Sequence, residues 1–388
     1  MKKKLITITS FVLLFFVATG CFVYLTLDGR VESNPASNAI IAVIRPYPKL
    51  TGPKAITLNC DYHGKKLSIT ETVYSSLYNY YKADPQKLYA YYNNKNEKFV
   101  YAYKNDPTIA DMAMKIKTVG KTNNLSEDQT LDLAACFLQS MPYDTAKATK
   151  VLDTSTRYPV NQLVPRLPYE TLYDGIGICT DKSYLGSLLF KQLGYKTSLL
   201  EFDSQRHMSV GVGVPDGYGD FGTKYAILEL TGTNFLVGDV PDLNPSEGLA
   251  INNFDSVAIA TENQPATEAV KVALTSPSLV VPISSAGNEY QRIITRITLR
   301  KQLEGYAPKL DSLKTKYLES KEKLVGAETD LNSAENDYTK NPTAQSFATY
   351  SQMYNIYTTA YNTAKTDIDI YNSTVKEYNT LVLEYRQF

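Results

Sequence analysis

The stretch DGIGICTDKSYLGSLLFKQLGY, residues 174–195, places a single cysteine directly before an amphipathic run. Gly175 and Gly177 precede the cysteine, and Gly194 follows the last apolar residue, as glycines do past the end of a helix. The pattern predicts a helix that begins at Cys179 and buries one side. The residues of that side recur at helical spacing: Tyr184, Leu185, Leu188, Leu189 and Leu193.

Two interpretations of Cys179 are open at this point. The positive end of a helix dipole stabilises a thiolate, so a cysteine at a helix start is a candidate nucleophile. A small apolar residue that fills a core is the alternative. A nucleophile also needs a base, and the chain contains only two histidines, His63 and His207. His63 lies in the run YHGKK, where we expect a solvent-exposed turn, so His207 is the candidate base.

His207 begins the strand-like run HMSVGVGV, and a carboxylate interrupts the apolar run YAILELTG. Gly211 and Gly213 alternate to the same side of the strand as His207, so we expect open space beside the imidazole. The carboxylate is Glu229, and its burial is costly unless the charge is paired. We therefore predict that Glu229 lies on a neighbouring strand and holds the tautomer of His207.

The order of elements around Cys179 favours an α+β fold. Ser126 and Gln129 have the spacing of a capping box, and the helix that they open ends before Pro142. The helix at Cys179 comes next, and three strand-like runs follow it, YKTSLLEF, RHMSVGVGV and KYAILELTG. Helices followed by consecutive strands predict an antiparallel sheet with helices packed on it, rather than an alternating parallel sheet.

Five segments in this order resemble the transglutaminase-like domain of papain-type cysteine enzymes: FLQSMPYD, RYPVNQL, GICTDKSYLGSLLFKQLGY, HMSVGVGV and ILELTGT. The resemblance runs from about residue 126 to 240 and is closest to membrane-tethered archaeal and bacterial members. It implies a papain-like core in which Cys179 is the nucleophile, His207 the base and Glu229 the orienting acid. Animal transglutaminases carry aspartate at the position of Glu229, and either carboxylate can accept from an imidazole.

An oxyanion formed by attack on an amide needs hydrogen-bond donors. The backbone N–H of Cys179 is one, and the resemblance implies Gln139 as the second, with a surface residue at a helix end as the alternative. Tyr143 and Tyr158 are predicted to line the cleft or to pack. Asp181 matches an acidic position in the tethered relatives, where we expect a structural role in the first turn.

The N-terminus carries three lysines and then an uncharged run, Leu5–Leu27. As a helix this run reaches about 35 Å, enough to cross a hydrocarbon core of about 30 Å. Residues 1–30 are thus an uncleaved transmembrane anchor, or a signal segment of lipoprotein type with Cys21 as the acylated residue. Both interpretations place the bulk of the chain outside the cell membrane.

Three cysteines remain beyond the N-terminus, and an odd number leaves at least one unpaired. Paired cysteines outside the membrane would be expected to oxidise. A bridge between Cys60 and Cys136 is one arrangement that the count allows, and no pattern selects it. A thiol left over is a mild indication of a chemical role.

The last hundred residues, 288–388, change character. We predict an antiparallel helical coiled-coil hairpin, broken at Asn341-Pro342, with a kink or a helix start at Pro308. In the first arm the heptad positions are Leu303, Leu310, Tyr317, Leu324, Leu331 and Tyr338, together with Tyr306, Leu313, Ser320, Ala327 and Ala334. In the second arm they are Phe347, Tyr354, Tyr361, Ile368, Val375 and Val382, together with Tyr350, Tyr357, Ala364, Tyr371, Tyr378 and Tyr385. A structural spacer and a contact surface for a helical protein or a second copy are both open.

The remaining boundaries follow from composition. Residues 31–120 are predicted to form a stalk and a lead-in α/β segment, 121–250 the transglutaminase-like domain, and 251–287 strand remnants and a linker. Lys and Arg number 40, as do Asp and Glu, so nothing favours a nucleic-acid partner.

The function predicted from these observations is a membrane-anchored, extracytoplasmic cysteine hydrolase that acts on peptide or isopeptide amides. Hydrolysis is favoured over cross-linking because no calcium-ligand loop is apparent, and we expect neither a metal nor another cofactor. The alternative is a non-catalytic tethered scaffold or peptide-binding protein whose hairpin contacts a partner.

Overall fold

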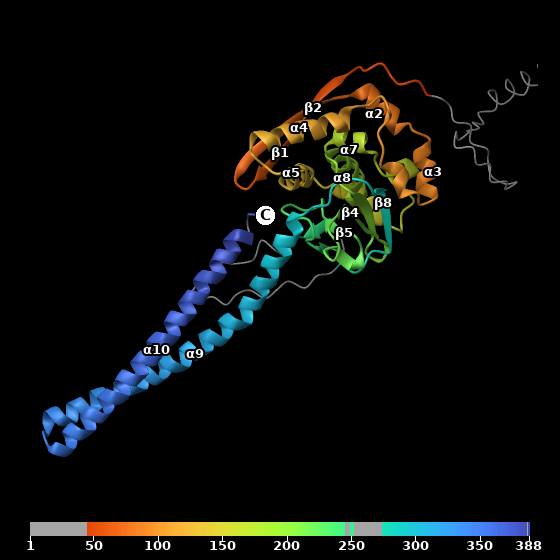
Figure 1. Ribbon diagram of the computed structural model, residues 1–388. Helices are drawn as coiled ribbons and strands as arrows, with labels where there is room; N and C mark the ends of the chain where they lie inside the picture. Colours follow the sequence, from red (N-terminus) through yellow and green to blue (C-terminus); the bar gives the residue numbers. More distant parts are fainter. Residues whose placement is uncertain (1–44, 245–248, 252–273, 386) are drawn as a thin grey trace, which may run out of the picture. The chain divides into compact units, whose positions relative to one another are not determined.

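The computed structural model in Figure 1 describes residues 45–244, 249–251, 274–385 and 387–388. The chain divides into two units, Met1–Lys49 and Leu50–Phe388. Of the first unit only residues 45–49 are described, and they form neither helix nor strand. The predicted anchor, residues 1–30, lies outside the described residues. Among those that are described, none of the helices has the length and apolar character needed to span a bilayer.

The second unit contains both helices and strands. Its α-helices are α2 (Ser75–Lys82), α3 (Gln86–Tyr92), α4 (Thr108–Thr122), α5 (Glu127–Gln139), α6 (Thr145–Leu152), α7 (Pro168–Asp174), α8 (Cys179–Leu193), α9 (Arg292–Lys340) and α10 (Ala344–Tyr385). Its strands are β1 (Pro53–Tyr62), β2 (Lys65–Tyr74), β3 (Thr197–Phe202), β4 (His207–Gly213), β5 (Tyr225–Leu228), β6 (Asp242–Asn244), β7 (Leu249–Ile251) and β8 (Leu279–Ser284). Short 3-10 turns are η1 (Asn96–Phe99), η2 (Val160–Gln162), η3 (Asp203–Gln205) and η4 (Asp220–Gly222).

The strands form antiparallel sheets, so the predicted α+β class is confirmed. The largest sheet has the order β5-β4-β3-β8, and β1-β2 and β6-β7 form two-stranded sheets. Residues 251–287 were predicted to be strand remnants and linker, and within this range Leu279–Ser284 forms β8, which pairs with β3 along the edge of the main sheet. The short run of apolar residues in β8 carries too weak an alternation to have shown this from sequence.

Helix α8 occupies the centre of the unit. It packs against β3 and β4 of the main sheet and against α4, α5 and α7 (Figure 1). Gly194 ends the helix in a left-handed conformation, at φ 104°, as the sequence predicts. Nearly every residue of α8 is buried, which is more than the single buried side predicted, because elements cover it all round. A central helix of this kind fixes its first residue, Cys179, with little freedom.

A disulfide joins the hairpin β1–β2 to the helical layer. The chain turns at His63 and Gly64, both with positive φ, and His63 is exposed there as predicted. Cys60 on β1 is bonded to Cys136 on α5, and their Cα atoms are 5.7 Å apart. The structure therefore selects the pairing that the cysteine count only allowed, and Cys179 remains a free thiol.

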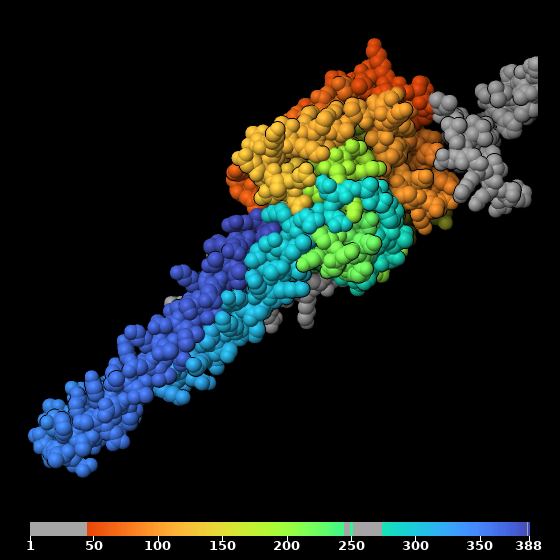
Figure 2. Space-filling view, in the orientation of Figure 1, coloured from red at the N-terminus to blue at the C-terminus, as the bar shows by residue number. Residues whose placement is uncertain are grey.

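The predicted C-terminal helical hairpin is confirmed, with α9 and α10 packed side by side and joined at residues 341–343 (Figures 1 and 2). The helix start predicted at Pro308 is wrong, because α9 runs without interruption from Arg292 to Lys340 and contains the proline. A proline inside a helix removes one backbone hydrogen bond, and the length of α9 on both sides accommodates that loss. Supercoiling of the two arms stays a prediction.

The contact between the arms follows the predicted heptads in α9 but only partly in α10. Every predicted heptad residue from Leu303 to Tyr338 is buried or half-buried. In the first half of α10, however, Phe347, Tyr354 and Tyr361 are exposed. The residues one position earlier in the chain, Ser346, Met353 and Ala360, are buried or half-buried. In this half of α10 the contact with α9 is therefore displaced by one residue at these heptad positions.

The first turns of α9 are fixed to the rest of the unit by charges. The Asp128 carboxylate accepts hydrogen bonds from the backbone N–H groups of Gln291 and Arg292 at 2.8 and 2.9 Å, and so caps the helix. Arg292 pairs with Asp132 at 2.7 Å. Such contacts are charge-assisted and hold the base of α9 against α5.

Candidate active site

Cys179 is the first residue of α8. It follows the turn between α7 and α8, which contains Gly175 and Gly177. Gly175 ends α7 in a left-handed conformation, at φ 68°, and the chain then enters α8 through Ile178. The free N–H groups of the first helical turn are therefore close to Cys179. Only 6% of Cys179 is exposed, so little of the residue meets solvent.

His207 lies at the first position of β4, and its side chain is fully buried. Its Nε2 atom is 2.7 Å from Oε2 of Glu229 and 3.1 Å from the Ser209 hydroxyl. The Nδ1 atom is buried and has no partner in hydrogen-bonding geometry among the described residues. Because Nε2 is occupied, Nδ1 is the nitrogen left for the Cys179 thiol, which lies near enough to influence the pKa of His207.

The open space predicted beside His207 is not there. A side chain at Gly211 would meet Ser198 and Tyr225, and one at Gly213 would meet Lys196. The glycines are therefore required by close packing within the sheet rather than by a cavity next to the imidazole.

Glu229 lies one residue beyond the end of β5, and hydrogen bonds surround its carboxylate. Oε1 accepts from the backbone N–H groups of Leu230 and Thr231, at 2.9 and 2.8 Å, and from the Thr231 hydroxyl at 2.7 Å. Oε2 accepts from His207 and from the Ser209 hydroxyl. A carboxylate so fully satisfied is fixed in one orientation, and it fixes the imidazole in turn.

Burial and pairing together set the protonation of this pair. Burial opposes the charge of Glu229, but His207, Ser209 and Thr231 outweigh it and lower the pKa of the carboxyl to about 2. Burial likewise opposes a charged His207, but Glu229 and the adjacent Cys179 raise its pKa to about 10. At neutral pH the pair is therefore an imidazolium and a carboxylate.

Gln139 does not fit the predicted role of oxyanion donor. Its Nε2 group donates to the carbonyl oxygens of Glu229 and Phe235, both at 2.8 Å, so both of its N–H donors are occupied. Its amide instead joins the end of α5 to the loop that carries Glu229. The prediction of Gln139 is therefore corrected, since a donor must be free to reach a developing oxyanion.

Tyr143 lies beside Cys179. Its hydroxyl accepts from the backbone N–H of Cys179. Burial raises the pKa of Tyr143, and its electrostatic interactions with Cys179, Glu229 and Asp181 raise the pKa further, so the phenol keeps its proton. A short parallel bridge between Tyr143 and Gly177 holds this segment beside the start of α8. Tyr158 instead donates to Asp153 at 3.3 Å, a local contact.

Lys182 is a buried residue of the site that the sequence did not indicate. Its Nζ atom donates to the carbonyl of Leu230 at 2.8 Å, and the carbonyl of Gln139 lies 3.5 Å away. Burial lowers its pKa to about 8, and the nearby Glu229 opposes that change. A lone lysine within an apolar helical run was the only signal available, and such residues usually reach solvent.

Asp181 has the structural role predicted for it. It accepts from the backbone N–H of Ile178 at 3.3 Å and pairs with Lys147 at 2.8 Å and Arg166 at 2.9 Å. Burial opposes its charge, but these two cations lower the pKa of Asp181. The ion pairs attach the start of α8 to α6 and to the loop before α7.

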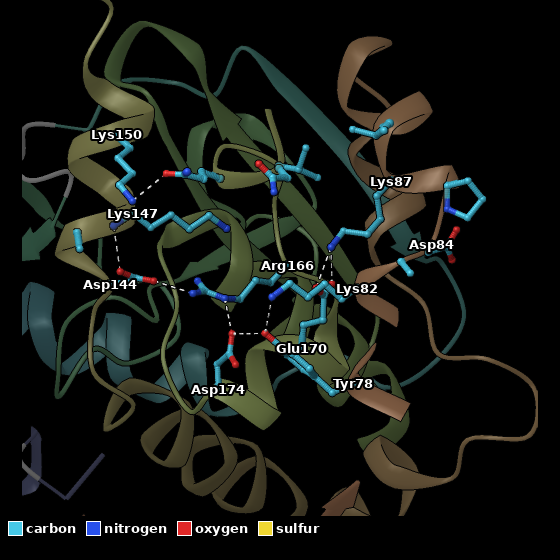
Figure 3. A pocket seen from close by; sticks show the side chains of 17 residues that line it. Tyr78, Lys82, Asp84, Lys87, Asp144, Lys147, Lys150, Arg166, Glu170 and Asp174 are labelled. Carbon is cyan, nitrogen blue, oxygen red and sulfur yellow. Dashed lines mark hydrogen bonds and ion pairs between the residues drawn. The ribbon is translucent and has the colours of Figure 1, made fainter. Parts of the chain in front are cut away.

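Two cations of this ion-pair network, Lys147 and Arg166, also line a cavity of about 640 Å³ (Figure 3). Its walls carry Lys82, Lys87, Lys147 and Arg166, and Glu170 accepts from Lys87 at 2.6 Å. The residues that line it do not include the cysteine, histidine and glutamate of the site. The cavity is therefore separate from the candidate chemistry.

The structure thus brings Cys179, His207 and Glu229 together from α8, β4 and the residue after β5, and it places Tyr143 beside Cys179. Sequence reasoning also missed the contacts of Ser209. Within the described part of the chain, no group of three or more His, Cys, Asp or Glu side chains is arranged to hold a metal ion. Searches of protein families, of curated proteins and of solved structures found no match to this chain.

Proposed function

We propose that the protein is a cysteine hydrolase of peptide or isopeptide amide bonds, built on a transglutaminase-like, papain-type core. The observation that carries the proposal is the orientation of His207, whose Nε2 pairs with Glu229 at 2.7 Å while Nδ1 is left beside Cys179. A nucleophile, a base and an orienting acid in one chain of contacts are the arrangement that covalent amide cleavage requires.

The steps follow from the charges. The Cys179 thiolate attacks the amide carbon, and a carbon–sulfur bond forms as the carbonyl electron pair moves to oxygen. The imidazolium of His207 gives its proton to the leaving nitrogen when the carbon–nitrogen bond breaks, and a thioester remains. Neutral His207 then takes a proton from water, whose oxygen attacks the thioester and releases the acid and the thiolate.

Two donors serve the oxyanion in this scheme, the backbone N–H of Cys179 and the hydroxyl of Tyr143. In the substrate-free protein the hydroxyl accepts from that N–H, so it occupies the place of the substrate oxygen. Substrate entry therefore requires the phenol ring to shift, after which the O–H donates to the oxyanion.

An extracytoplasmic location, with a single-pass anchor in residues 1–30, belongs to the proposal. The disulfide between Cys60 and Cys136 supports it, since such bonds persist in oxidising compartments. The three lysines before the uncharged run support the same orientation.

A peptide library incubated with the full-length chain tests the proposal, with cleaved bonds identified by mass spectrometry. We expect cleavage that is abolished in Cys179→Ala and reduced about 10²–10³-fold in Tyr143→Phe, the usual loss for one oxyanion donor. Circular dichroism of each variant serves as the folding control. Intact folded protein that cleaves no peptide would favour the non-catalytic, peptide-binding alternative.

A further inference from the structure

The first half of α10 presents a surface without charge. Residues 341–364 contain no Asp, Glu, Lys, Arg or His, although 21% of the whole chain is charged. Exposed faces of helices normally carry charged side chains. This stretch instead consists of Tyr, Phe, Ile, Met, Ala and small polar residues. Depletion of charge with enrichment of aromatic residues is the composition of a protein–protein contact.

Three aromatic residues form a line along this surface. Phe347, Tyr354 and Tyr361 are spaced by seven residues and are 53%, 52% and 46% exposed. The contact with α9 is made one position earlier in the chain, where Ser346 is buried and Met353 half-buried. The aromatic line therefore flanks the contact between the arms, and about half of its surface is available to a partner.

The line and the uncharged segment share the same centre. Tyr354 is the middle residue of the line, and it is also the midpoint of Ala344 to Ala364, the uncharged part of α10. A two-fold axis at Tyr354 would place Phe347 of one chain opposite Tyr361 of the other. Lys365, the first charge after the segment, would then lie beyond the start of the partner helix.

We propose that this face of α10 binds the same face of a second copy of the chain, with the two helices antiparallel about Tyr354. A self-complementary contact brings each residue near its own counterpart, so like charges close to the axis would repel each other, and this face has none. A parallel pairing would instead place Lys365, Asp369 and Lys376 opposite themselves. The antiparallel pairing also opposes the helix dipoles favourably.

The contact is small, so the association is reversible. Each half-exposed aromatic side chain offers roughly 100 Å², and the face as a whole roughly 500 Å² per copy. Stable dimers bury about 800 Å² per partner, so micromolar or weaker affinity is expected in solution.

Cysteine cross-linking of the full-length chain tests the pairing, in a background with Cys21→Ser and Cys179→Ser. Under mild oxidation we expect Tyr354→Cys to form a covalent dimer. Phe347→Cys alone should not, because its counterpart lies about 21 Å away along the helix. A mixture of Phe347→Cys and Tyr361→Cys should cross-link. The control is Leu318→Cys on α9, where Leu318 is 50% exposed, and this variant should form no covalent dimer.

Sedimentation equilibrium gives an independent measurement. Tyr354→Lys should shift the chain to monomer at concentrations where the unchanged protein dimerises, and Leu318→Lys should not. Cross-linking of Tyr354→Cys no faster than Leu318→Cys would overturn the proposal, as would a protein that is monomeric throughout. Efficient cross-linking of Phe347→Cys to itself would show a parallel pairing and would overturn it equally.

Discussion

At the scale of single residues, the site depends on how completely Glu229 is satisfied. Two backbone N–H groups, two hydroxyls and His207 surround one carboxylate that no solvent reaches. An unpaired charge at such depth would cost several kcal/mol. The contacts therefore keep Glu229 ionised, and the ionised Glu229 keeps the His207 imidazole charged and in one orientation.

This arrangement predicts how stability depends on pH. The pKa of His207 is raised from 6.5 to about 10, so its contribution is complete below pH 6.5 and is lost as the pH rises toward 10. The pKa of Glu229 is lowered from 4.5 to about 2, so its contribution is present above pH 4.5 and is lost as the pH falls toward 2. The difference in unfolding free energy between the unchanged protein and His207→Gln should be greatest between about pH 4.5 and 6.5. It can be measured by urea unfolding at several pH values, and a difference that stays constant from pH 6 to 10 would contradict a charged imidazole.

The sequence indicated the cysteine, histidine and glutamate but not the oxyanion donor. Those three stand out because each is chemically unusual in its segment. Gln139 and Tyr143 are four residues apart in one segment, and we propose Tyr143 as the donor because the carbonyl oxygens of Glu229 and Phe235 occupy the amide of Gln139. Those carbonyls come from positions 90 or more residues away, so local patterns carry no information about them.

At the scale of elements, the disulfide joins the hairpin β1–β2 to the helical layer, which an ion pair between Lys115 on α4 and Glu71 on β2 also connects, at 2.9 Å. Cys60 and Cys136 are separated by 76 residues in the chain. In the chain-entropy account, closing a loop of that length stabilises the folded state by about 4 kcal/mol. The bond therefore supports α5, the helix whose end lies against the loop of Glu229.

The double variant Cys60→Ser, Cys136→Ser should accordingly lose about 4 kcal/mol of unfolding free energy. Replacing both cysteines leaves no new thiol to react. Chemical denaturation of the variant and of the unchanged protein gives the value, and Ser312→Ala, at an exposed position on α9, supplies the control. Equal stability of the double variant and the unchanged protein would show that the bond does not form.

Helical elements were more predictable than their contacts. Heptad spacing and Asn341-Pro342 predicted both arms of the hairpin and the break between them. Two overlapping heptads run through α10, and both sets of positions were predicted to face α9. In the structure Ser346 and Ala364 are buried and Ala360 is half-buried, whereas the predicted positions Phe347, Tyr354 and Tyr361 are exposed.

At the scale of the whole molecule, a buried ion pair links the hairpin of α9 and α10 to the rest of the second unit. Arg296 on α9 is buried and pairs with Asp239, and it also donates to the carbonyl of Val237. These residues follow Phe235, whose carbonyl is held by Gln139. The base of α9 therefore contacts the same loop region that positions Glu229. Strand β8, which pairs with β3, is the element directly before α9 in the chain.

The most direct test of the central claim is the rate at which iodoacetamide alkylates Cys179 in the folded protein at pH 7. Peptide mapping by mass spectrometry isolates this thiol, and the urea-unfolded chain provides the reference for an ordinary cysteine. Sulfur, imidazole and carboxylate acting together predict labelling at least tenfold faster in the folded chain, with that advantage lost in His207→Gln and reduced in Glu229→Gln. Labelling no faster than in the unfolded chain, or unchanged by His207→Gln, would contradict the account.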